Sequence, residues 1–336
     1  MDIRYPEYYK QFSCIASSCP DSCCKEWSVS VDDQSAAYYR QLSGPLGDRL
    51  RAVLQDTDDG TIMVIEDGRC PMWRQDGLCR IQAELGHDAL CQVCRDFPRL
   101  RHDYGSFTEL GLELSCPEAA RLILGASSAE WIMETVPGGE DADYEPEIMD
   151  TLLRTRSEFL DFLNTTYLPM PQILAVLLLY AHDVQAELDG GETACLDPEN
   201  ALADGVAFAQ GGDISAVQAF FLELEILTPA WENRLRSPAS GLHWENCSKA
   251  LVRYFICRYW LQAVSDYDVL CRAKFVVVAC LLIASLGGEM VETAQLFSKE
   301  IENDADNVEA ILDGAYTNPA MTDVALLGLL LKGVSL

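Results

Sequence analysis

Cysteines crowded into the first part of the chain are the residues with the clearest capacity for chemistry. Nine of the 14 cysteines precede residue 120, at positions 14, 19, 23, 24, 70, 79, 91, 94 and 116. The run CIASSCPDSCC has the spacing C-x4-C-x3-C-C and is followed by C-P-x7-C, C-x2-C and S-C-P-E. Thiolates on turns a few residues apart can converge on one soft metal centre, either zinc or an iron–sulfur cluster.

The compartment decides what such thiols can do. The first residues, MDIRYPEYYK, lack the apolar core of a secretory signal. The longest apolar runs, Ile173–Ala181 and Phe275–Leu286, are shorter than the roughly 20 residues of a transmembrane helix. We therefore expect a soluble cytoplasmic protein with no membrane partner. Disulfides are disfavoured in a reducing cytoplasm, so clustered cysteines there more often bind metal or perform redox chemistry.

The charge of the chain restricts its partners. With 24 basic and 53 acidic residues the formal net charge is −29, and the acidic residues are spread over the whole length. A negative surface repels phosphate backbones and anionic lipid, so we expect no nucleic-acid partner. It attracts a basic or lysine-bearing partner, or it serves only to keep the protein soluble.

The elements that must position the first nine thiols are short. A helix is predicted at Ser35–Leu54, and Thr61–Ile65 has the β-branched composition of a strand. Turns follow at Asp67-Gly68 and Asp76-Gly77, and a helix is predicted to start at Cys116-Pro117. Loops and turns are therefore expected to carry most of the thiols.

The second half has a different character. Residues 136–147 combine Pro, Gly and acidic side chains, a composition typical of an exposed linker. We predict a mainly α protein with a Cys-rich metal-binding domain at residues 1–135, containing short strands and loops, a linker at 136–147, and an all-helical domain at 148–336. Apolar residues recur at helical spacing in seven segments of that domain: 148–163, 171–188, 214–227, 247–264, 269–286, 290–304 and 322–333.

Charged residues beside the thiols could tune a metal centre. Arg95 and Arg99 would offset the negative charge of a thiolate centre, or they pair with acidic neighbours such as Asp96. His87 and His102 lie among the cysteines and could complete a mixed Cys/His site, although isolated surface histidines are the commoner case.

Four segments carry a family resemblance: FSCIASSCPDSCCKEWSVSVD, CPMWRQDGLCRIQAELG, CRDFPRL and ELSCPEAARLIL. Together they resemble the flagellin lysine N-methylase family, whose members have a Cys-rich first half followed by a helical remainder. The chain is more loosely similar to zinc- or iron-chelating proteins with a C-x2-C-x3-C-C motif, from which its x4 gap departs. The resemblance continues through residues 245–258 and 266–274.

The resemblance implies a function, cofactors and site residues. It implies methyl transfer from S-adenosylmethionine to lysine side chains of flagellin, in the context of the bacterial flagellum. It also implies a cysteine-ligated iron–sulfur cluster, expected to be [4Fe–4S], with zinc as the alternative metal. The first ligand candidates are Cys19, Cys23, Cys79 and Cys94. Further matching cysteines are Cys14, Cys24, Cys70 and Cys116, whereas Cys91 matches none and is treated as incidental.

Methyl transfer sets requirements that the sequence meets only in part. The lysine amine, with an ordinary pKa of about 10.4, must lose its proton before it can attack. Tyr254 is our candidate catalytic residue, and Arg95, Arg99 and Asn246 are candidate cofactor-binding residues. The chain has no G-x-G-x-x-G turn, so the cofactor pocket is unplaced. It also lacks the C-x3-C-x2-C of radical chemistry, which a nucleophilic amine does not need.

The alternative is a non-enzymatic module that binds zinc or an iron–sulfur cluster for redox or interaction purposes. Such a module should not bind S-adenosylmethionine. Colour separates the metals, because zinc–thiolate sites are colourless whereas iron–sulfur clusters absorb visible light.

Overall fold

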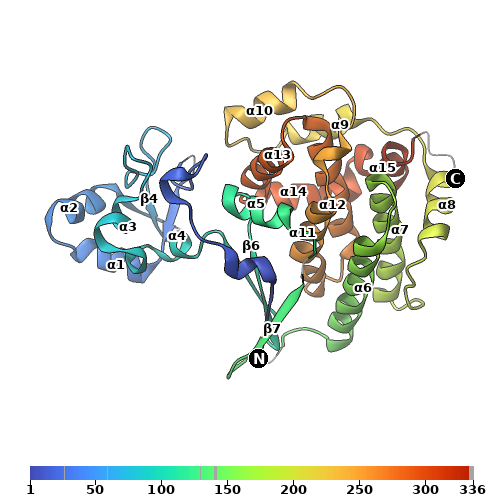
Figure 1. Cartoon of the computed structure of the whole chain (residues 1–336), viewed down its shortest axis with the longest axis horizontal. Coiled ribbons are helices and arrows are strands. Elements are labelled where there is room, and N and C mark those ends of the chain that lie inside the picture. The colour runs from blue at the N-terminus through green and yellow to red at the C-terminus, as the bar shows by residue number, and fades with distance from the viewer. Residues whose placement is uncertain (26, 59, 129, 140–141, 333–336) are drawn as a thin grey trace.

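The computed structural model describes residues 1–25, 27–58, 60–128, 130–139 and 142–332. The chain folds into a small lobe, which holds β2–β4 and α1–α4, and a larger helical body, with a second sheet beside that body (Figure 1). The prediction of a mainly α protein is confirmed. The metal-binding character of the Cys-rich part stays a prediction.

The small lobe is built on a three-stranded antiparallel sheet in the order β2-β4-β3. The predicted strand at Thr61–Ile65 corresponds to β4. The predicted helix at Ser35–Leu54 is two helices, because Pro45 lacks the amide hydrogen that a continuous helix would need and starts a new helix instead. The elements of the lobe are β2 (Val29–Val31), α1 (Asp33–Gln41), α2 (Gly44–Val53), β3 (Leu54–Thr57), β4 (Gly60–Met63), α3 (Arg80–Leu85) and α4 (Gln92–Asp96).

A second sheet, which the sequence analysis did not predict, contains the first residues of the chain. Its strands lie in the order β5-β6-β1-β7, with bounds β1 (Asp2–Pro6), β5 (Arg99–Asp103), β6 (Phe107–Leu112) and β7 (Trp131–Thr135). Strand β1 is parallel to β6, with Asp2 opposite Phe107, and antiparallel to β7, with Tyr5 opposite Ile132. The first residues are therefore held between segments that lie more than 100 positions later.

The helical body confirms the predicted helices and adds others. The bounds are α5 (Pro117–Gly125), α6 (Pro146–Thr165), α7 (Met170–Leu188), α8 (Pro198–Phe208), α9 (Ile214–Phe221), α10 (Pro229–Arg236), α11 (Lys249–Tyr259), α12 (Val269–Leu286), α13 (Met290–Phe297), α14 (Ala305–Thr317) and α15 (Asp323–Leu330). The sequence analysis missed α8 and α10, and it placed α14 in no predicted segment. The segment predicted at 322–333 ends at residue 333, which lies outside the described residues.

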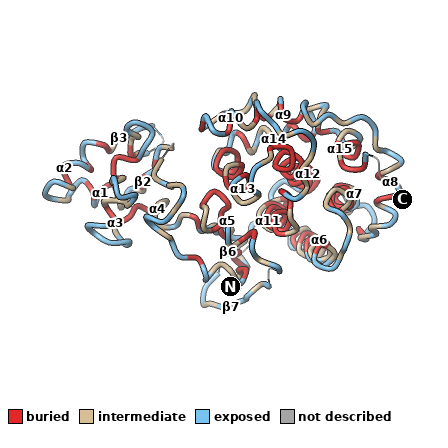
Figure 2. The backbone as a smooth tube through the Cα atoms, turned by 45° about the horizontal axis from the view of Figure 1, so that its top comes forward, coloured by how far each residue is buried: buried red, intermediate tan, exposed pale blue. Residues whose placement is uncertain are grey.

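Helix α12 is the centre of the body. All of its residues are buried, and it packs against α7, α9, α11 and α14 (Figure 2). Among the described residues it is the one helix long and apolar enough to cross a membrane, and the whole of it is enclosed by protein.

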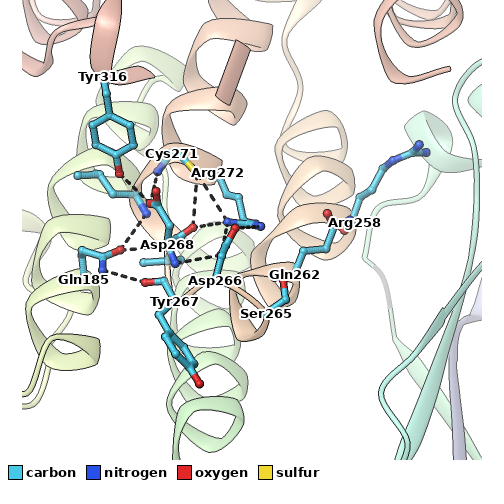
Figure 3. A network of polar contacts seen from close by, with 12 residues as sticks. Gln185, Arg258, Gln262, Ser265, Asp266, Tyr267, Asp268, Cys271, Arg272 and Tyr316 are labelled. Atoms are coloured by element: carbon cyan, nitrogen blue, oxygen red, sulfur yellow. Dashed lines mark hydrogen bonds and ion pairs between the residues drawn. The ribbon is translucent and has the colours of Figure 1, made fainter. Parts of the chain in front are cut away.

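A polar network fixes the N-terminus of this buried helix (Figure 3). Asp268 accepts a hydrogen bond from the backbone amide of Cys271 at 3.0 Å and from the Tyr316 hydroxyl at 2.8 Å. Arg272 donates two hydrogen bonds to the Asp266 carboxylate, at 2.9 and 2.8 Å. Gln185 of α7 accepts from the amide of Val269 at 3.0 Å. The segment 266–274, where the resemblance continues, thus anchors the central helix.

Replacing Asp268 with alanine should lower the free energy of unfolding by about 1–2 kcal/mol, because the helix loses its N-terminal cap. Asp268→Asn retains an acceptor oxygen, so it should lower the free energy of unfolding by only a few tenths as much as Asp268→Ala does. Chemical denaturation of both variants checks the expectation. An asparagine variant as unstable as the alanine variant would show that the carboxylate charge, rather than the cap, stabilises this end.

The buried apolar residues form two clusters. The smaller one lies in the lobe between Val29 and Cys91. The larger one joins the helices of the body with Phe12, Phe107 and Leu112 near the second sheet. The predicted linker at 136–147, of which residues 140 and 141 lie outside the described part, leads from β7 into α6. The division of the chain at this segment stays a prediction.

Candidate functional site

A cavity of about 580 Å³ lies where the small lobe meets the helical body. Seven of the nine early cysteines line it: Cys14, Cys19, Cys23, Cys24, Cys79, Cys94 and Cys116. The opposite wall comes from the body and carries Glu225, Lys299, Glu300 and Asp304. Residues separated by up to 290 positions in the sequence therefore face one space.

Irregular segments and helix ends hold the thiols of the lobe wall. Cys14, Cys19 and Cys23 lie in the connection between β1 and β2. Cys79 directly precedes α3, and Cys116 directly precedes α5 at the border of the second sheet. These positions confirm the expectation that loops and turns carry most of the early thiols.

Several thiols are close enough to change each other's protonation. The Cys24 thiol interacts with those of Cys23 and Cys70, which raises the pKa of Cys24 and lowers the pKa of Cys23 to about 7. The thiols of Cys91 and Cys94 interact in the same way. Their contact lowers the pKa of Cys91 to about 7 and raises the pKa of Cys94. Five of the nine early thiols thus form two contacting groups: Cys23, Cys24 and Cys70 in one, and Cys91 and Cys94 in the other.

Burial keeps other thiols of the cavity protonated. It raises the pKa of Cys19 and Cys79, and it raises the pKa of Cys116 to about 11. Only a bound cation would make such thiolates stable at neutral pH, because ligation requires the deprotonated form.

The metal-ligating groups at the cavity are mainly soft thiols. Within the described residues, no group of three or more His, Cys, Asp or Glu side chains is close enough to hold a single metal ion. An iron–sulfur cluster is larger and holds its four thiolates further apart, and the cavity wall supplies soft thiol donors in excess of four. The residues present fit a soft metal centre, either an iron–sulfur cluster or zinc.

The body wall contains a turn of π-helix, η6 (Ser298–Glu302), which continues directly from α13. Single π-helical turns are rare and occur frequently at functional sites. Glu300 in this turn accepts hydrogen bonds from the backbone amides of Leu227 and Thr228, at 2.8 and 3.3 Å, so the loop before α10 is fixed against it. This wall carries three carboxylates, those of Glu225, Glu300 and Asp304, together with Lys299.

Asp21 connects the two walls. It lies between Cys19 and Cys23, and its carboxylate contacts Lys299 at 3.3 Å and Lys25 at 2.7 Å. Gln295 of α13 also donates to Asp21, at 3.1 Å. Burial alone would raise the pKa of the Asp21 carboxyl, but the two lysines lower it below its usual value. The carboxylate therefore stays ionised and holds the Cys-bearing loop against the π-helical turn.

The candidate cofactor-binding residues lie in different places. Arg99 lines the cavity, with its guanidinium 5.1 Å from the centre of the Phe12 ring. Arg95 does not line it and lies 4.0 Å from the Asp96 carboxylate. Asn246 is buried and does not line the cavity either. The structure thus brings one of these three candidates to the thiols.

Tyr254, the candidate catalytic residue, belongs to a buried network. Its hydroxyl donates to Glu302 at 2.9 Å and accepts from Arg258 at 2.9 Å. Tyr259 donates to the same carboxylate at 2.9 Å. Tyr254 lines a separate cavity of about 40 Å³, and so does His102, one of the two histidines considered as metal ligands. The other, His87, lines the large cavity. Burial raises the pKa of Tyr254 well above its usual value.

Sequence analysis missed the whole body wall and the pairing of Cys91 with Cys94. The only signal for the wall is the acidic run KEIENDAD at residues 299–306, which is typical of an ordinary helix end. The C-x2-C spacing of Cys91 and Cys94 was a usable signal for this contact, but Cys91 was treated as incidental because it matches no cysteine of the resembling family.

Two of the known proteins to which the chain is similar carry the same name. The chain is 31% identical over 145 residues to a lysine-N-methylase of Salmonella choleraesuis and 32% identical over 142 residues to one of Salmonella typhimurium. Each match covers 39% of this chain and 35% of the relative, so the matched part spans about a third of those enzymes. No family model and no solved structure matches the chain.

A shorter relative is covered more completely. The flagellar biosynthetic protein FliU of Salmonella muenchen is 32% identical over 137 residues, which are 38% of this chain and 79% of FliU. Because that match spans most of FliU, and because the lysine-N-methylases match over a similar share of this chain, the chain belongs to the flagellin lysine N-methylase family.

Proposed function

We propose that this protein transfers methyl groups from S-adenosylmethionine to the side-chain amines of lysines in flagellin. The observation that carries the proposal is the similarity to proteins named lysine-N-methylase, together with the flagellar name of FliU. The net charge of −29 supports a lysine-bearing protein substrate, because a negative surface attracts basic partners.

The reaction is a displacement at a sulfonium carbon. The lone pair of the neutral lysine Nζ attacks the methyl carbon, and the carbon–sulfur bond breaks with its electron pair moving to sulfur. The products are a methylammonium, which then loses a proton, and S-adenosylhomocysteine. The enzyme must therefore align the amine with the methyl group and accept the proton that the lysine loses.

The cavity supports this reaction. Its volume of about 580 Å³ falls within the range of about 300–1,000 Å³ for small-molecule sites. Glu225 is exposed at its wall and can receive a proton or orient an ammonium group. Lysines need such help because their ordinary pKa is about 10.4.

We further propose that thiols of the lobe wall hold an iron–sulfur cluster. The candidate ligands Cys19, Cys23, Cys79 and Cys94 all line the cavity. Bound there, a cluster would fix the Cys-bearing segments relative to one another and shape the pocket. We also propose a cytoplasmic location, because a reducing compartment keeps clustered thiols available to a metal.

Anaerobically purified protein, mixed with flagellin and S-adenosylmethionine, should add methyl groups to flagellin lysines. Mass spectrometry of flagellin peptides measures this, and flagellin whose lysines have been acetylated is the matched control. Visible absorption with iron, sulfide and zinc analysis of the same sample identifies the metal. Protein that neither binds S-adenosylmethionine nor modifies flagellin would instead be a non-enzymatic metal-binding module.

A further inference from the structure

We propose that the methyl donor binds in the Cys-lined cavity, with its carboxylate at Arg99 and its ammonium and sulfonium groups facing the carboxylates of Glu225 and Asp304. This inference rests on the proposed function and assigns its unplaced cofactor pocket.

The charges in the cavity complement those of a sulfonium amino acid. S-adenosylmethionine carries one carboxylate, one ammonium group and one sulfonium. Arg99 has no carboxylate within ion-pair distance among the described residues, so its guanidinium remains available to a ligand carboxylate. Arginine binds carboxylates in a bidentate manner, which would fix the amino-acid end of the donor.

The opposite wall supplies acceptors for the two cationic groups. The backbone of Glu225 is fixed by Asn307, which accepts from its amide at 3.0 Å and donates to its carbonyl at 2.9 Å. The Glu225 side chain has no ion pair among the described residues. Asp304 caps α14 through one oxygen, 3.0 Å from the amide of Asn307, and so its second oxygen can face the cavity. Two carboxylates thus lie on a backbone that is already held in place.

Aromatic side chains complete the pocket. Phe12 and Trp27 line the cavity, and the Trp27 indole donates to the carbonyl oxygen of Cys23 at 2.9 Å. The partly exposed Trp27 ring provides a stacking surface for a purine, whereas Phe12 is buried and its ring packs near the Arg99 guanidinium. This arrangement replaces the glycine-rich turn of the open α/β methyltransferases, which the sequence lacks.

Calorimetric titration of the metal-loaded protein with S-adenosylmethionine tests the assignment. Arg99→Gln and Glu225→Gln should each weaken binding about tenfold, because each removes one charged partner of the donor. Arg101→Gln and Glu223→Gln are matched controls, since both residues are exposed nearby and neither lines the cavity. Iron content and melting temperature should stay at the wild-type values in all four variants.

Titration with a second ligand distinguishes the role of Arg99 from that of Glu225. S-adenosylhomocysteine lacks the sulfonium charge, so Glu225→Gln should weaken its binding less than that of S-adenosylmethionine, whereas Arg99→Gln should weaken both equally. If wild-type protein binds the donor and the Arg99 and Glu225 variants bind like their controls, the pocket lies elsewhere and the proposed function stands. Wild-type protein that binds no donor would overturn both.

Discussion

Replacing Arg156 with methionine is expected to lower the free energy of unfolding by about 3–5 kcal/mol, because the Glu109 carboxylate would stay buried without its cation. Arg156 on α6 donates to the two oxygens of Glu109 on β6, at 2.8 and 2.6 Å. Both residues are less than 7% exposed. This ion pair joins the second sheet to the helical body, so its loss also weakens the attachment of the first residues of the chain.

Equilibrium denaturation measures the effect, and the chain offers a matched control. Arg121 makes the same two-fold contact with Glu118, at 2.8 and 2.7 Å, but its side chain is 63% exposed. Arg121→Met should therefore change stability by no more than about 0.5 kcal/mol. The double variant Arg156→Met with Glu109→Leu should regain most of the loss. If Arg156→Met were as mild as Arg121→Met, the pair would not be the connection that we describe.

The sequence predicted best where local signals agreed. Helix α12 was predicted with its observed bounds, because Asp268 caps its start and Gly287, with a φ of 64°, ends it. The second sheet was missed for the opposite reason. Its strands are short and rich in charged residues, such as RLRHD at Arg99–Asp103, and their partners lie far apart in the sequence. Pairing of this kind leaves little local pattern.

The candidate site, too, was predicted from the sequence only in part. The clustering of thiols was visible in the sequence, and seven of them do line one cavity. The body wall was not visible, because a π-helical turn continues the helical periodicity: we predicted one helix over residues 290–304, and the structure has α13 followed by η6. The connection through Asp21 joins positions 274 and 278 residues apart, a separation that no local motif encodes.

Cys91 and Cys94 provide the sharpest test of the metal proposal. The two thiols interact, but Cys94 lines the cavity and Cys91 does not. Cys94→Ala should therefore remove most of the bound iron and the visible absorption. Because the binding free energy of a structural metal centre contributes to folding, it should also lower the melting temperature by on the order of 10 °C.

Cys91→Ala is the matched variant, since it removes a neighbouring thiol from the same interacting pair. It should keep its iron and absorption and lose only the packing of one buried sulfur, about 1 kcal/mol. Cys195→Ala, at an exposed position remote in sequence, controls for thiol count. Iron analysis, absorption spectra and thermal denaturation of the three proteins distinguish the possibilities.

The pattern of results identifies which thiols act as ligands. Full iron content in Cys94→Ala would remove Cys94 from the ligand set, and loss of iron from Cys91→Ala alone would place the centre on the buried side of the pair. Because Cys79 directly precedes α3, Cys94 lies within α4, and both line the cavity beside the first Cys-bearing loop, loss of iron in Cys94→Ala would support a metal that joins these segments. The metal centre would then stabilise the fold of the small lobe as much as the small apolar cluster does.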